Sequence, residues 1–309
     1  MVNRSQSSNM ALIKDKRGIF FTALVILIIT LFVLSFTFYS QINERKSTQK
    51  RIETMNNFLF SIEKDMPRQV YISGFRIIFL IEGRIAETGN YVPDVNAIMQ
   101  ESFFNGTLYG QPQDLMIGVT FKEIESKIRE KANKINTNIT LSKPTLEIEQ
   151  EDPWNIKLIL TTKFLMEDLN GLALWNKTEV TIAYIPIETF DDPLYLVSTN
   201  GAFSNKFYKA DDIVDYVNFN SNSTKYVNNT DAPSFINRLQ GSSGADENGI
   251  ESLVNLIRLS NAGVNAKEGV SIVDHLYFSP NTPSGCHVQG RESWFLLDAE
   301  HLNTYGFSC

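Results

Sequence analysis

The chain has 309 residues, of which 43% are hydrophobic and 20% are charged. This composition provides enough apolar material for a folded core and excludes a chain that is disordered throughout. The net charge of −7 argues against a nucleic-acid-binding protein, which needs a basic surface. A mean hydropathy of −0.14 excludes a protein built from many membrane-spanning helices.

One segment near the N-terminus, residues 19–39, has 21 residues with no charge, glycine or proline. A helix of about 20 apolar residues spans the roughly 30 Å hydrocarbon core of a bilayer. A buried helix of a globular protein would be amphipathic, whereas this segment is apolar on all sides. It is also longer than the roughly 7–15 apolar residues of a removable secretory signal. The segment therefore predicts a retained transmembrane helix that follows a basic N-terminus at 1–18.

The charges that flank the segment do not decide its orientation, because four basic residues precede it and four follow it. Two other features predict a cytoplasmic N-terminus and an extracytoplasmic bulk. The first is a set of five N-glycosylation sequons, at Asn105, Asn138, Asn176, Asn222 and Asn228. The second is the pair Cys286 and Cys309, the only cysteines, which favour a disulfide in an exported region. Closing that loop would stabilise the fold by about 3 kcal/mol.

A helical region is predicted at 40–140, after the apolar segment. Apolar residues at 52–66 recur at alternating spacings of three and four, which is typical of a helix that packs along one stripe. Pro67 is expected to end or kink this helix. The apolar stretch 70–85 contains two arginines and a glutamate, and so predicts a buried helix rather than a second span. An amphipathic helix is predicted at 117–135.

The pattern changes beyond residue 140, where apolar and polar residues alternate. This alternation predicts strands with one buried face at 145–149, 156–164 and 179–187, with a turn at 168–171. Residues 198–232 and 237–248 are rich in Asn, Ser and Asp and predict loops. Closer to the C-terminus we predict a helix at 250–260 and strands at 270–278 and 294–298.

These elements together predict an α+β protein. Its transmembrane helix continues into a long helix, and a mixed helical and antiparallel β-rich head follows outside the membrane. The predicted regions are 1–18, 19–39, 40–140 and 141–309, the last being the β-rich extracytoplasmic domain.

The sequence contains no catalytic or cofactor motif. The local ligand spacing of zinc sites, the calcium loop, the glycine motifs of nucleotide binding and the hydrolase elbow are all missing. The histidines, His275, His287 and His301, are therefore expected to be surface or partly buried imidazoles. Asp192 is expected in a turn and Asp211 at a solvated helix start. We predict a non-enzymatic protein with no catalytic, metal or cofactor site.

Two other residue groups have a structural and a functional interpretation. Aromatic residues at alternate strand positions are typical of a core, and a ligand groove is the alternative for Tyr277, Phe278, Trp294 and Phe295. A nucleophile pair of Cys286 and His287 is disfavoured, because adjacent residues of a strand point to opposite faces.

The residues around Gly18 carry a resemblance to a known family. The basic stretch Lys14-Asp-Lys-Arg-Gly18 directly precedes the apolar segment and resembles the processing site of type IV pilin-like proteins, especially archaeal ones. The resemblance implies cleavage between Gly18 and Ile19 and a long helix packed on a β-rich head. Ala23 stands where many bacterial members carry Glu. Residues 185–195 and 249–255 resemble segments of large archaeal membrane-anchored proteins, which implies location and architecture.

We therefore predict a single-pass, membrane-anchored cell-surface protein with a pilin-like plan and a structural or adhesive role. Its partners would be the lipid bilayer and other pilin-like subunits or a surface ligand, and not nucleic acid. One alternative is a membrane-tethered module that binds glycan or another ligand through Trp294, Tyr277 and the Asn/Asp-rich loops. A second alternative is an ectoenzyme in which His287, His301 and an acid converge.

Overall fold

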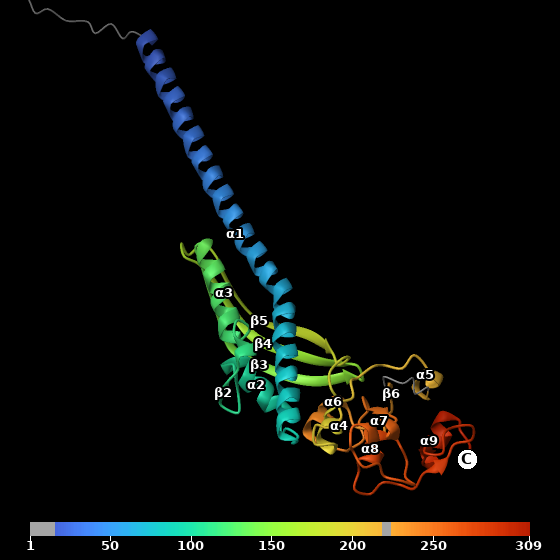
Figure 1. Cartoon of the computed structure of the whole chain (residues 1–309). Coiled ribbons are helices and arrows are strands. Elements are labelled where there is room, and N and C mark those ends of the chain that lie inside the picture. The colour runs from blue at the N-terminus through green and yellow to red at the C-terminus, as the bar shows by residue number, and fades with distance from the viewer. Residues whose placement is uncertain (1–15, 218–223) are drawn as a thin grey trace, which may run out of the picture. The chain divides into compact units, whose positions relative to one another are not determined.

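The computed structural model describes residues 16–217 and 224–309, with side chains from residue 20 onward. The fold is α+β, as predicted, with a long N-terminal helix followed by shorter helices and small antiparallel sheets. The chain divides into two compact units, Met1–Asn57 and Phe58–Cys309. Figure 1 shows the elements in chain order.

The first helix, α1, runs continuously from Lys16 to Thr88 (Figure 1). All residues at 20–39 have exposed side chains, and α1 is the one helix in the described chain that is long and apolar enough to cross a membrane. The helix does not end at Pro67, which lies inside it. A proline inside a helix costs about 3 kcal/mol. Burial of Met66 and Val70 on either side of it offsets that cost.

The predicted packing stripe of α1 is confirmed in its second half. Leu59, Ile62 and Met66 are buried, whereas Ile52 is exposed. The stretch 70–85 belongs to the same helix. Most of its aliphatic side chains are buried in the protein core, as predicted, whereas Phe75 and Phe79 are exposed. Burial of so many aliphatic side chains stabilises this part of the helix far more than its intrinsic propensity would.

A three-stranded antiparallel sheet follows, with strands β3 (Thr137–Asp152), β4 (Asn155–Asp168) and β5 (Leu174–Pro186) in that order. The three predicted strands are confirmed, and each is longer than its alternating core. The turn between β4 and β5 is also confirmed, because the Asp168 carboxylate accepts the backbone N–H of Asn170 and Gly171 adopts a positive φ. Even-numbered residues of β4 are buried from Ile156 to Asp168, which defines the inner face of the sheet.

The inner face of the sheet packs against the second half of α1 at Gly74. A Cβ atom at this position would lie 2.1 Å from Cδ1 of Leu158 and 2.6 Å from Cδ1 of Ile185. The absence of a side chain therefore allows the helix to approach the sheet closely. Two further helices, α2 (Val95–Asn105) and α3 (Phe121–Lys134), lie against β3. A capping box of Thr120 and Glu123 starts α3.

Replacing Gly74 by leucine is expected to destabilise the head by about 1–3 kcal/mol, because the new side chain overfills the helix–sheet contact. Gly83 lies in the same helix, and a Cβ there would meet nothing within 4 Å. Gly83→Ala is therefore expected to stabilise the protein by about 0.5–1 kcal/mol through helix propensity. Urea unfolding of the detergent-solubilised chain measures both changes. Equal effects of the two substitutions would contradict the packing.

The remaining chain forms short elements joined by loops. Between α2 and α3 lie β1 (Thr107–Leu108), β2 (Gln111–Pro112) and the 3₁₀ helix η1 (Asp114–Met116). After β5 come α4 (Pro193–Ser198), α5 (Ile213–Val217), β6 (Tyr226–Asn228), α6 (Phe235–Gln240), β7 (Ile250–Ser252), α7 (Leu256–Asn261), α8 (Asp274–Tyr277), β8 (Cys286–His287), β9 (Leu296–Leu297) and α9 (Ala299–Tyr305).

The loop predicted at 198–232 contains α5 and β6. One helix and one strand prediction for this region are also wrong in part. Residues 250–252 form β7, which pairs with β6, so the helix predicted at 250–260 is limited to α7. The strand predicted at 270–278 contains the helical turn α8 instead. In both places the apolar spacing reports burial and not secondary structure, because tertiary contacts override the local preference of short segments.

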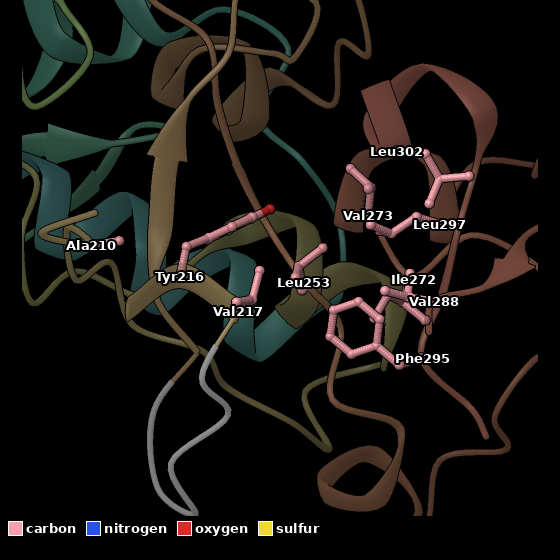
Figure 2. Close-up of a cluster of buried hydrophobic side chains, with 10 residues drawn as sticks. All are labelled: Ala210, Tyr216, Val217, Leu253, Ile272, Val273, Val288, Phe295, Leu297 and Leu302. Atoms are coloured by element: carbon pink, nitrogen blue, oxygen red, sulfur yellow. The ribbon is translucent and has the colours of Figure 1, made fainter. Parts of the chain in front are cut away.

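A hydrophobic cluster holds the C-terminal elements together. Figure 2 shows its members, which are Ala210, Tyr216, Val217, Leu253, Ile272, Val273, Val288, Phe295, Leu297 and Leu302. Val273 and Leu302 in this cluster stand close in sequence to His275 and His301. The cluster therefore anchors the two helices that carry these histidines, α8 and α9.

Candidate functional site

Gly18 and Ile19, the predicted processing residues, lie in the first turn of α1. Four of the predicted sequon asparagines, Asn105, Asn138, Asn176 and Asn228, are exposed, and Asn222 lies outside the described residues. Exposure of the acceptor side chain is required for glycosylation.

A disulfide joins Cys286 and Cys309, with Cα atoms 5.8 Å apart. The bond ties the last residue of the printed sequence to β8, where a free chain end would fray. It also leaves no free thiol on Cys286 for the nucleophile pair with His287.

The expectation of surface or partly buried histidines is correct for His287 and wrong for His275 and His301, which are buried. His287 is exposed on β8, and its Nε2 lies 3.2 Å from the carbonyl oxygen of Arg291. His275 and His301 are buried, with 9% and 2% of their surface exposed. The structure therefore does not join His287 to His301, and instead brings His275 and His301 together.

His275 and His301 converge on the buried carboxylate of Glu251. Nε2 of His275 lies 3.3 Å from Oε2 of Glu251, and Nε2 of His301 lies 3.2 Å from the same oxygen. The three residues come from separate elements, β7, α8 and α9. Two imidazole nitrogens and a carboxylate oxygen thus face one another in the interior, and we call these three residues the Glu251 cluster.

A second set of side chains orients the Glu251 cluster. Nδ1 of His301 lies 2.8 and 2.9 Å from the two carboxylate oxygens of Asp298, and the Ser271 hydroxyl donates to Asp298 at 2.7 Å. The Tyr305 hydroxyl donates to Oε1 of Glu251. These contacts fix the orientation of both His301 and Glu251.

The proximity of opposite charges shifts the pKa values in this cluster. Burial by itself would lower the pKa of His301, but hydrogen bonds to Asp298 and Glu251 outweigh burial and raise that pKa to about 10. Burial would raise the pKa of Glu251, but hydrogen bonds from His275 and His301 hold it below its ordinary value. The pKa of Asp298 is lowered in the same way by hydrogen bonds from His301 and Ser271, against the effect of burial.

A buried ion network adjoins the Glu251 cluster through Ser252 and Asp274. The Arg238 guanidinium donates to Asp192 at 2.7 Å and to the two oxygens of Asp274 at 3.0 and 3.2 Å. These side chains are fully buried. Asp274 also accepts the backbone N–H and the hydroxyl of Ser252, at 2.9 and 2.7 Å. Asp274 and Ser252 are the sequence neighbours of His275 and Glu251, so the network positions both members of the cluster.

The aromatic residues mostly occupy the core, as predicted. Tyr277 and Phe295 are buried, and Phe278 and Trp294 are half-buried. The Tyr277 hydroxyl accepts the backbone N–H of Lys267 at 2.7 Å. The buried ring of Tyr277 presents no open face for stacking on a sugar.

Glu82 is a buried acid on α1, outside the apolar segment, with 6% of its surface exposed. Within the described residues, its Oε1 has no hydrogen-bond partner. Burial, and secondly the negative charge of Asp191, raise the pKa of Glu82 from 4.5 to about 9. Glu82 is therefore protonated at neutral pH in the folded chain.

The stability of the head is expected to fall as pH rises from about 5 to 9. Unfolded Glu82 loses its proton near pH 4.5 and folded Glu82 near pH 9. The folded state thus binds more protons in this window, and each pH unit costs up to about 1.4 kcal/mol. Glu82→Gln should flatten this slope in urea unfolding measured across the window, whereas Glu87→Gln, at an exposed position of α1, should not. An unchanged slope in Glu82→Gln would contradict the raised pKa.

The comparisons with known proteins add no assignment to these sites. No protein-family model, no curated protein and no solved structure matches this chain. The long apolar helix and the α+β head are consistent with a pilin-like plan on their geometry alone.

Proposed function

We propose that this chain is a single-pass, membrane-anchored cell-surface protein of pilin-like plan, with a structural or adhesive role through assembly or partner contact. The N-terminus is cytoplasmic and the head is extracytoplasmic. The disulfide between Cys286 and Cys309 and the four exposed sequon asparagines support this orientation, because both features belong to exported regions.

The observation that carries the proposal is that the two parts of α1 have different surroundings. Residues 20–39 are apolar and exposed on all sides, which is unfavourable in water and favourable in lipid. Residues 59–85 of the same helix supply buried side chains to the head. One continuous helix thus serves both as an anchor and as a core element.

The outer face of the sheet supports a role in partner contact. Val180, Ile182 and Tyr184 on β5 are 53%, 40% and 51% exposed, and β5 is an edge strand of its sheet. Exposed apolar side chains beside an edge strand are typical of contact surfaces. Assembly would involve this face, the apolar helix, or both.

Mass spectrometry of the protein from its native membrane tests the pilin-like part of the proposal. We expect an N-terminal peptide that begins at Ile19. Gly18→Val should leave Met1 in place, whereas Ser8→Val, upstream of the junction, should not affect processing. A wild-type chain that retains Met1 would contradict pilin-like processing while leaving the membrane anchor intact.

A further inference from the structure

The Glu251 cluster has the donor set and spacing of a metal site. The ligand atoms of Glu251, His275 and His301 all lie within 4.8 Å of one another, and all three residues are buried. Two imidazoles and one carboxylate form a three-residue ligand set that zinc proteins use, with a fourth position left for water or another ligand. Calcium and magnesium prefer sites made of oxygen alone, so the imidazoles favour a transition metal.

The two distances from the imidazoles to Oε2 of Glu251 match those expected between ligands of one ion. Bonds of about 2.0–2.2 Å at tetrahedral angles place neighbouring ligand atoms about 3.3–3.5 Å apart. Nε2 of His275 and Nε2 of His301 lie 3.3 and 3.2 Å from Oε2 of Glu251. The third distance, between the two imidazole ligand atoms, is no more than 4.8 Å, so adjustment of the side chains alone would bring the three atoms around one ion.

The surrounding contacts are those that metal ligands use to hold their orientation. Asp298 accepts from Nδ1 of His301, which leaves Nε2 of that ring directed at Glu251. The Tyr305 hydroxyl donates a hydrogen bond to Oε1 of Glu251, so Oε2 remains available to bind the ion. His275 also lines a cavity of about 200 Å³ together with Tyr91 and Phe278, so one side of the cluster adjoins space that a small ion can enter.

We propose that Glu251, His275 and His301 bind one divalent transition-metal ion, for which Zn²⁺ is the best match. On binding, the ion takes the place of the Nε2 proton of His301, which passes to solvent, while Nε2 of His275 binds the ion with its ring proton held on Nδ1. The ion would join β7, α8 and α9. It would thus cross-link the C-terminal part of the head in addition to the disulfide, which goes beyond the proposed anchoring function.

The test uses the full chain, purified in detergent without a polyhistidine tag and stripped with EDTA. Isothermal titration with ZnCl₂ should show one ion bound per chain, with release of protons and a rise in Tm. MgCl₂ at the same concentration should give no stoichiometric binding, no release of protons and no rise in Tm. Replacing zinc by Co²⁺ should give the visible absorption of a cobalt ion with nitrogen and oxygen ligands.

Matched variants locate the ion. His275→Gln and Glu251→Gln should abolish the one-to-one binding, and Asp298→Asn should weaken it by about 10–100-fold, because Asp298 orients His301. His287→Gln replaces an exposed histidine outside the cluster and should bind zinc as the wild type does. Circular dichroism of each variant identifies any that fail to fold.

The wild-type titration keeps the proposal falsifiable even where a variant does not fold. Absence of stoichiometric Zn²⁺ and Co²⁺ binding to the folded wild type would overturn it and leave a hydrogen-bonded cluster only. If folded His275→Gln still bound zinc fully, the ion would lie elsewhere and the proposal would be overturned. The same would follow if folded His287→Gln lost zinc binding.

Discussion

Replacing Arg238 by methionine is expected to lower the free energy of unfolding of the head by about 3–5 kcal/mol. Arg238 is fully buried and bridges the buried carboxylates of Asp192 and Asp274. Without the guanidinium, two negative charges remain in the interior with no compensating cation. Methionine fills much of the same volume, so the loss reports charge rather than a cavity.

Urea unfolding of the detergent-solubilised full chain, followed by circular dichroism, measures this change. Arg68→Met is the matched control, because Arg68 forms an exposed ion pair with Asp65, with 67% and 44% of the two side chains exposed. Exposed pairs of this kind contribute about 0–1 kcal/mol. If the two variants lost equal stability, the buried network would not be a major determinant of the fold.

Two lysines in the middle of the apolar segment are expected to prevent membrane insertion of the chain. Each lysine at the centre of a transmembrane helix costs about 2.5–3.5 kcal/mol, so Ile28→Lys combined with Leu31→Lys costs about 5–7 kcal/mol. Translation in the presence of membranes, followed by alkaline extraction, measures insertion.

Ile42→Lys is the control for that experiment, because Ile42 is exposed just beyond the apolar segment. It should leave the chain in the membrane fraction. Resistance of the double-lysine variant to alkaline extraction would show that residues 19–39 are not the segment that holds the chain in the bilayer.

Elements with a strong and local pattern could be predicted from the sequence. The strict alternation along β4 reflects one buried and one open face, and its period belongs to strands alone. The apolar segment at 19–39 is equally distinct, because a run of 21 residues without charge, glycine or proline is typical of a membrane-spanning helix. The disulfide between Cys286 and Cys309 could also be predicted, because they are the only two cysteines and an exported head favours a disulfide.

The buried charges could not be predicted, because their partners lie far apart along the chain. Arg238 lies 46 residues from Asp192 and 36 from Asp274, and Asp192 looked like an ordinary turn residue. The burial of Asp192 depends on tertiary packing. The periodic pattern of a single sequence carries no signal for such packing.

The Glu251 cluster was missed for the same reason. Glu251 lies 24 residues from His275 and 50 from His301, so no local ligand spacing exists to detect. A weak signal was available for two of the three residues, since Glu251 and His275 stand next to apolar residues in the segments predicted at 250–260 and 270–278. A polar residue that can titrate within such a segment suggests an internal partner.

Protease added to the outside of intact cells tests the membrane-anchored arrangement most directly. The head, residues 58–309, is expected to be digested while a cytosolic marker protein stays intact. The protein should also enter the membrane fraction, and Cys286 and Cys309 should react with an alkylating reagent only after reduction. A head that remains intact until the cells are lysed, with both thiols freely alkylated, would contradict an exported, membrane-anchored protein.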